Sequence, residues 1–185
     1  MTLFNDKYRV ESARLKGWDY TKSAAYYVTI CTQGKENFFG KIENDIMNLS
    51  EVGEIVKEEW LKTELIRKYV YLDEFVVMPN HFHGIIMIIN DERDRNTSIQ
   101  NETAHRAVST NDLLSTAILQ ADSLGSIIGQ FKSVCTKRIR EKYNARFEWQ
   151  ERFFDRVIRD ENEMNNIREY IHYNPVRWHT DKFFS

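Results

Sequence analysis

The sequence is poor in cysteine and in long apolar runs, and it has no excess of positive charge. Its two cysteines, Cys31 and Cys135, are too few and too far apart for a disulfide framework or a zinc knuckle, so we expect two buried free thiols. No apolar run approaches the roughly 18 residues that a membrane span needs. The first residues also lack the apolar core of a secretory signal. We therefore expect a cytoplasmic protein with no membrane partner.

The net charge of −2 at pH 7 counts against a non-specific nucleic-acid binder, which is usually basic. The distribution of charge is less even than the sum, because basic residues gather near the N-terminus and again between residues 132 and 159. A molecule with one basic face and a molecule with a mixed, solvated surface both fit this pattern.

The length of 185 residues and the 42% hydrophobic content predict a single domain over residues 1–185. Residues 90–122 are rich in Asp, Asn, Ser and Thr and have no strong periodicity, so we expect a flexible insertion there. We place no chemistry in this stretch and expect its His105 to be solvated.

Hydrophobic periodicity predicts the order of the secondary-structure elements. We expect strands over 24–32, 38–49 (a hairpin that turns at 43–45), 70–78, 81–89 and the end of 147–159, and helices over 51–64, 124–142 and from 161 to about 174. Ser50 is a suitable N-cap for the first helix, and Asp160 with Glu163 forms a capping-box pattern at the last.

The segment VVMPNHFHGIIMII, residues 76–89, holds two histidines between apolar runs. In a strand, side chains two residues apart share a face, so His81 and His83 point to one side and Phe82 to the other. Two adjacent imidazoles on a rigid strand provide two of the ligands of a divalent-metal site. The alternative is a pair of half-exposed histidines on the surface of a sheet.

The last predicted helix places Tyr170 and Asn174 on one face, one turn apart. A purely structural interpretation also fits: Tyr170 packs on the sheet with its hydroxyl at the rim, and Asn174 caps the end of the helix.

Four motifs in this order, MPNHFHGII, FKS…TKRI, WQ before a strand, and IREYIHYNPVRW, resemble those of the REP-associated tyrosine transposases. These are single-tyrosine members of the HUH endonuclease superfamily. The resemblance runs from about residue 20 to residue 182, apart from the insertion. It implies an α+β fold of the ferredoxin-like HUH endonuclease kind, an antiparallel sheet with helices packed on one face.

The resemblance also implies a function and a site. It implies a metal-dependent single-stranded DNA endonuclease and transposase that cleaves and rejoins DNA, at hairpin or repeat sequences, through a 5′-phosphotyrosine intermediate. His81, His83 and Asn174 would bind Mg²⁺ or Mn²⁺, and Tyr170 would be the nucleophile. Tyr173 is a rival nucleophile three residues on, and His172 faces away from Tyr170.

The DNA-contacting residues are inferred from the basic helix 124–142 and the segment that follows. Lys132, Lys137, Arg138 and Arg152 are candidate phosphate contacts. Trp149, Phe153 and Trp178 could stack on bases, although core packing is the commoner role of such residues. A homodimer is an open alternative to a monomer.

Three other classes of protein compete with this interpretation. A histidine-triad nucleotide hydrolase needs a third histidine where this chain has Ile85. A catalytically inactive DNA-binding or regulatory module of the same fold would have a degenerate site, and the presence of His81, His83 and Tyr170 argues against such decay without excluding a loss of activity. The third class is a plain metal-binding scaffold. A phosphotyrosine intermediate separates a tyrosine nuclease from all three.

Overall fold

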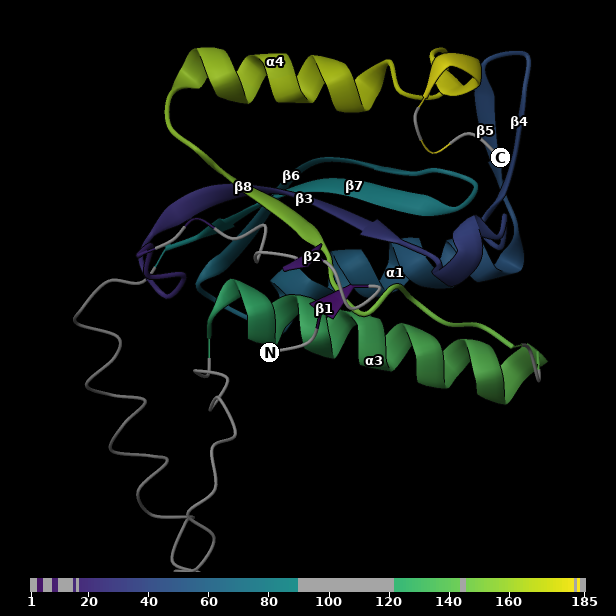
Figure 1. The fold of residues 1–185 in the computed structure, drawn as a ribbon, viewed down its shortest axis with the longest axis horizontal. Helices are drawn as coiled ribbons and strands as arrows, with labels where there is room; N and C mark the ends of the chain where they lie inside the picture. The colour runs from purple at the N-terminus through teal and green to yellow at the C-terminus, as the bar shows by residue number, and fades with distance from the viewer. Residues whose placement is uncertain are drawn as a thin grey trace, which may run out of the picture.

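The computed structural model describes residues 3–4, 8–9, 15, 17–89, 122–143, 146–181 and 183, so the predicted insertion lies outside them except for Asp122. Four antiparallel strands form the central sheet in the order β6-β7-β3-β8: β3 (Ala24–Cys31), β6 (Val70–Val77), β7 (His81–Ile88) and β8 (Phe154–Ile158). Helix α1 (Glu51–Leu65) precedes β6, and α3 (Leu124–Tyr143) precedes β8. The resulting β-α-β-β-α-β order is ferredoxin-like (Figure 1).

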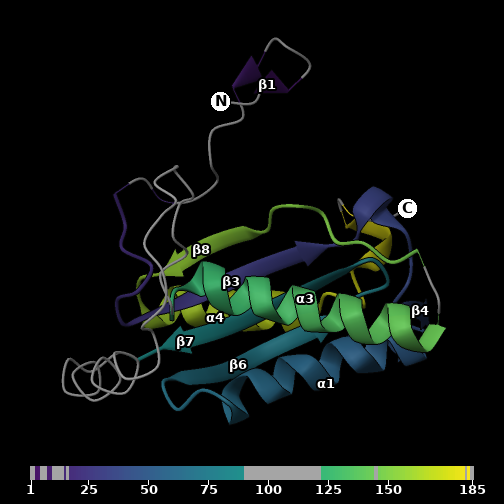
Figure 2. The ribbon, with the colours of Figure 1, turned by 90° about the horizontal axis from the view of Figure 1, so that it is seen from below.

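Helices cover both faces of this sheet, where the sequence predicted one. Helices α1 and α3 lie side by side on one face, and α4 (Glu161–His172) lies on the other (Figures 1 and 2). The larger core lies under α1 and α3, and a smaller cluster of Ile85, Ile158 and Ile171 lies under α4. The reason is that the strands also present apolar side chains on their second face, which α4 covers. The predicted α+β antiparallel fold is otherwise confirmed.

Short elements complete the described chain. They are two hairpins, β1 (Leu3–Phe4) with β2 (Tyr8–Arg9) and β4 (Gly40–Glu43) with β5 (Ile46–Leu49), and two 3₁₀ turns, η1 (Gln33–Lys35) and η2 (Trp178–Thr180). The predicted turn between β4 and β5 is confirmed. Asn44 and Asp45 have φ angles of 51° and 64° there, which suits the tight turns that join antiparallel strands.

Both predicted helix caps are present. The Ser50 hydroxyl accepts a hydrogen bond from the Gly53 amide, and the Asp160 carboxylate accepts one from the Glu163 amide. The Glu163 side chain reaches back to the Arg159 amide, one residue before the usual partner in a capping box. None of the helices among the described residues is long and apolar enough to cross a membrane.

Strand β7 fixes the direction of the two histidines through its buried face. Phe82 packs on Trp60 of α1, with ring centroids 4.6 Å apart. Gly84 leaves room for this contact, because a Cβ there would lie 2.8 Å from both rings. Phe82 is thus locked under α1, and His81 and His83 are held on the opposite face. Cys31 and Cys135 are buried thiols, as predicted.

Candidate metal and tyrosine site

The two histidines of β7 are buried side by side. His81 is 0% exposed and His83 is 1% exposed, and their ring centroids are 4.6 Å apart. The predicted shared face is therefore confirmed, and the alternative of half-exposed surface histidines is wrong. Buried imidazoles need defined partners, so the hydrogen bonds around each ring indicate what it can do.

The tautomer of His81 follows from its neighbour Asn80. The Asn80 amide nitrogen donates to the carbonyls of Lys35 (3.1 Å) and Phe183 (2.9 Å), which leaves its Oδ1 facing Nδ1 of His81 at 2.9 Å. An amide oxygen can only accept, so Nδ1 of His81 carries a proton. A neutral His81 then has its Nε2 lone pair available as a ligand.

His83 is oriented by two hydroxyl groups of β3. Its Nδ1 lies 2.7 Å from the Tyr27 hydroxyl and 2.9 Å from the Thr29 hydroxyl. The Tyr27 ring also stacks on the imidazole, with centroids 5.5 Å apart. Its other nitrogen, Nε2, lies 3.5 Å from the hydroxyl of Tyr170. Tyr27 and Thr29 thus fix the ring from one side while the second nitrogen faces the candidate nucleophile.

Tyr170 lies on α4 directly over the histidines. Burial raises the pKa of its phenol above the ordinary value of 10.0, and the charge of Asp181 raises it further. The side chains of Asn174 and Tyr27 and the charge of Arg177 act in the opposite direction. Burial has the largest effect, so the phenol is protonated at neutral pH and needs added positive charge to act as a nucleophile.

Asn174 lies beyond the end of α4 and is 1% exposed. Its Nδ2 lies 3.4 Å from Oδ2 of Asp181. Its Oδ1 is buried and has no hydrogen-bond partner among the described residues. A buried amide oxygen without a partner is costly, and a cation would satisfy it.

Asp181 is a site residue that the sequence motifs missed. One ligand atom from each of His81, His83 and Asp181 lies within 4.8 Å of the others, which makes the group able to hold a metal ion. Asp181 stands outside every motif that we used. The sequence feature that could have pointed to Asp181 is that it is the single Asp or Glu after Glu169.

The residue types fit a divalent cation. Two imidazole nitrogens, one carboxylate and a buried amide oxygen form a mixed nitrogen and oxygen donor set. The ring of Phe183 lies over that of His81, with centroids 4.5 Å apart, and Trp178 lies 5.9 Å from the same ring. The C-terminal residues therefore supply both a donor and an apolar cover to the site.

The neighbouring candidates on α4 point elsewhere. The Tyr173 ring is 45% exposed and contacts His172 and Arg177, with centroid distances of 4.8 Å and 5.9 Å. His172 is exposed and lies 3.7 Å from Glu74 of β6. Of the two tyrosines, Tyr170 is therefore the one whose hydroxyl faces the histidine pair.

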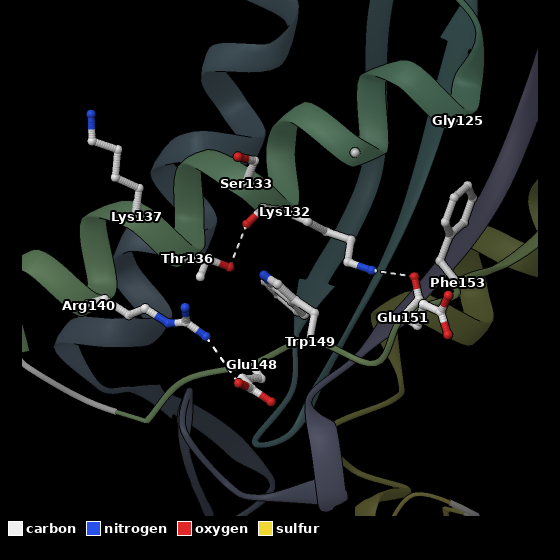
Figure 3. A pocket seen from close by; sticks show the side chains of 11 residues that line it. Gly125, Lys132, Ser133, Thr136, Lys137, Arg140, Glu148, Trp149, Glu151 and Phe153 are labelled. Carbon is white, nitrogen blue, oxygen red and sulfur yellow. Dashed lines mark hydrogen bonds and ion pairs between the residues drawn. The ribbon is translucent and has the colours of Figure 1, made fainter. Parts of the chain in front are cut away.

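Three of the four predicted DNA contacts, Lys132, Lys137 and Arg138, lie on α3, across the sheet from α4 (Figure 1). A groove of about 780 Å³ runs between α3 and residues 148–153, on the face of the sheet opposite α4 (Figure 3). Lys132 reaches across it and donates to the carbonyls of Gln150 (2.6 Å) and Glu151 (3.0 Å). Lys137 also lines the groove, and its exposed ammonium lies 3.9 Å from Glu141.

The other two cations differ in their surroundings. Arg138 pairs with Glu58 at 2.9 Å and with Glu59, both on α1. Arg152 is exposed and has no ion pair within the described part of the chain. The aromatic residues Trp149 and Trp178 are buried, as the core-packing alternative expects.

Comparison with known proteins finds similarity in both sequence and fold. No family model matches the chain. A Haemophilus influenzae protein described as uncharacterized is 35% identical over 177 residues, which cover 94% of this chain and 92% of that protein. A solved REP-associated tyrosine transposase bound to a REP hairpin aligns with a TM-score of 0.56 and 16% identity, over 89% of this chain and 73% of that one. At 16% identity, this similarity establishes the fold. The aligned protein is a REP-associated tyrosine transposase, the kind of protein whose motifs this sequence resembles.

Proposed function

This chain belongs to the family of the Haemophilus influenzae protein, and we propose that it is a metal-dependent single-stranded DNA endonuclease and transposase. One observation carries the proposal: the Tyr170 hydroxyl lies 3.5 Å from Nε2 of His83, at a group of two buried histidines and one half-buried carboxylate suited to a cation. A phenol beside such a group is what phosphoryl transfer to tyrosine requires. The fold shared with a hairpin-bound transposase supports hairpin or repeat DNA as the substrate.

Tyr170 would attack the phosphorus of the scissile phosphodiester. A bond forms between the phenol oxygen and phosphorus while the bond from phosphorus to the 3′-oxygen breaks. The phenol proton passes to solvent, and the departing oxygen takes up a proton to become a 3′-hydroxyl. The product is a 5′-phosphotyrosine, and attack on it by a 3′-hydroxyl would rejoin the strand without ATP.

The surroundings of Tyr170 act on its charge. Arg177 lowers the pKa of the phenol against the larger effect of burial. We propose His81, His83, Asn174 and Asp181 as the donors for Mg²⁺ or Mn²⁺, which when bound would supply positive charge and polarise the phosphate. Asn80, Tyr27 and Thr29 hold the two imidazoles in ligating orientation.

We also propose the predicted cations as phosphate contacts, with unequal shares. Lys137 and Arg152 have exposed charges and would contribute most. Lys132 and Arg138 already bond within the chain, so they would contribute only the charge that those bonds leave uncompensated.

Covalent trapping tests the proposal. We expect labelled single-stranded hairpins to form a denaturation-resistant adduct with the protein in Mn²⁺ or Mg²⁺, and none in the presence of a chelator. Tyr170→Phe should abolish the adduct, because it removes only the nucleophilic oxygen. His81→Ala should also abolish it.

Tyr173→Phe is the matched control, since it removes a hydroxyl from the same helix and should leave the adduct intact. Loss of the adduct in this variant would assign the nucleophile to Tyr173. Hairpin binding without any adduct, across a library of hairpins, would favour the inactive DNA-binding module instead.

A further inference from the structure

We propose that Phe154 is a stacking platform for one base of the single-stranded substrate, on the same face of the sheet as Tyr170. The inference rests on the proposed function and names a contact for the DNA strand that enters the site. Phe154 is 47% exposed. Every other phenylalanine whose side chain the structure describes is buried or half-buried.

The strand register places Phe154 on the catalytic face of the sheet. Thr29 pairs with His83 on one side and with Phe154 on the other, so the three residues form one row across β7, β3 and β8. Directly opposed residues of antiparallel strands project to the same face. The side chain of Phe154 therefore lies on the same side as the two histidines and Tyr170.

Ring contacts connect Phe154 to the nucleophile. The Tyr27 ring meets Phe154 edge to face, with centroids 6.3 Å apart and planes at 68°. The same Tyr27 ring meets Tyr170 with centroids 6.2 Å apart and planes at 90°. Phe154 is thus two ring contacts from the phenol that would attack the phosphate, so one DNA strand can touch both.

The charge along β8 suits a polyanion. This strand is an edge of the sheet, since it pairs with β3 alone. Residues 151–159 contain three exposed arginines, Arg152, Arg156 and Arg159, and one exposed acid, Glu151. Arg156 lies 2.5 Å from Glu163 of α4. A second copy of the chain paired antiparallel on this edge would bring like charges together, so a phosphodiester strand is the better occupant.

Tyr173 is a weaker candidate for the same role. It is exposed to a similar extent, but its ring is flanked by Arg177 and His172. In the described residues the ring contact of Phe154 is the edge-to-face one with Tyr27, which leaves exposed ring surface for a base. Stacking on such a ring tolerates any base, so Phe154 would strengthen binding of the flanking strand without reading its sequence.

The test measures binding apart from chemistry. Every protein carries Tyr170→Phe, and the probe is a hairpin oligonucleotide with 2-aminopurine placed in turn at each flanking single-stranded position. We expect quenched fluorescence at one position, and about tenfold weaker binding with loss of that quenching in Phe154→Leu. Phe154→Trp should retain both. Tyr71→Leu, which removes a 44% exposed aromatic from the opposite edge strand, is the control and should change neither.

Unchanged affinity and quenching in Phe154→Leu would overturn the inference. So would a change of sedimentation coefficient in Phe154→Leu, because a second copy of the chain would then be the occupant of this edge. If the protein with Tyr170 intact forms covalent adducts in the trapping assay while the Phe154→Leu variant binds normally, only the stacking role fails. If the protein binds no single-stranded DNA at all, the proposed function fails with it.

Discussion

Two oxygen donors, Asn174 and Asp181, lie beside the histidine pair, and they differ in charge and in origin. Asp181 brings a full negative charge from the C-terminal turn, where the Phe183 amide donates to its Oδ1 at 2.7 Å. Asn174 brings a neutral and fully buried oxygen from the end of α4. A cation between the two imidazoles would gain from both donors. The carboxylate would offset its positive charge, and the cation would give the buried amide oxygen a binding partner.

We therefore predict that each donor contributes to metal affinity. Asp181→Asn and Asn174→Leu should each weaken Mn²⁺ binding, measured by isothermal titration calorimetry, by about tenfold or more. Asn174→Asp keeps an oxygen at the same place and should retain binding. Asp45→Asn, an exposed acid on the β4–β5 turn, is the control. Unchanged affinity in both Asp181→Asn and Asn174→Leu would exclude this donor set.

The sequence predicts the contacts of the site that join residues close together in the chain, and it misses those that join residues far apart in the chain. The shared face of His81 and His83 follows from the two-residue period of a strand, and the Tyr170–Asn174 spacing follows from the helical turn. The hydroxyls of Tyr27 and Thr29 were not predicted, because they lie 56 and 54 residues from His83 in the chain and meet it through the register of β3 with β7. Local periodicity carries no information on register between distant strands.

At the scale of elements, the placement of α4 decides whether Tyr170 can reach the histidines. Arg168 of α4 donates two parallel hydrogen bonds to Asp73 of β6. One runs from Nε to Oδ1 (2.7 Å) and the other from Nη2 to Oδ2 (2.6 Å). This bidentate geometry fixes both distance and direction. Two residues later on the same helix, Tyr170 lies over β7. The pair therefore helps to position Tyr170, the proposed nucleophile, without touching it.

The Arg168–Asp73 ion pair predicts that the stability of the fold decreases at low pH. The hydrogen bonds from Arg168 hold the pKa of Asp73 below its ordinary value of 3.8. Because the pKa of Asp73 is lower in the folded state than in the unfolded state, the ion pair stabilises the fold at pH values above the unfolded-state pKa. This stabilisation is lost as the pH falls through the folded-state pKa. Asp73→Asn should lower the free energy of unfolding by about 1 kcal/mol at pH 7, since Arg168 is partly exposed.

Urea unfolding at pH 7 and at pH 3 measures this difference, which should shrink at the lower pH. Glu43→Gln is the matched control, because the Lys41–Glu43 pair is strongly exposed and should contribute little. A difference between Asp73→Asn and the unaltered protein that stays constant with pH would show that the carboxylate charge of Asp73 is not the stabilising feature.

The same scale shows why the sequence predicted elements better than their arrangement. The caps at Ser50 and Asp160 and the stripes of α1 and α3 are local patterns. Each element whose first residue was predicted begins at that residue, except β4, which begins two residues later, at Gly40. The face that α4 covers is not local. Its buried residues are few, with Ile171 alone fully buried among its twelve, so the helix gives a weak signal of the surface it packs against.

At the scale of the whole molecule, the net charge of −2 means that the proposed DNA affinity must come from local groups of cations. The cations of α3 lie across the sheet from Tyr170, while Arg152 stands just before β8, whose Phe154 borders the site. A strand held in the α3 groove would therefore reach Tyr170 around the β8 edge. An exposed cation that contacts a phosphate releases counterions condensed on the DNA, whereas Arg138 is already paired with carboxylates and would neutralise phosphate less.

The salt dependence of hairpin binding should therefore separate these cations. For a single strand, each phosphate contact contributes about 0.7 to the slope of log affinity against log salt concentration. Lys137→Ala and Arg152→Ala should each reduce the slope by roughly that amount and weaken binding several-fold at low salt. Arg138→Ala should leave the slope almost unchanged and lower thermal stability instead, because it leaves Glu59 without its partner on α3. Slopes unchanged in all three proteins would mean that the DNA follows another path, since a polyanion that crosses this edge cannot avoid Arg152.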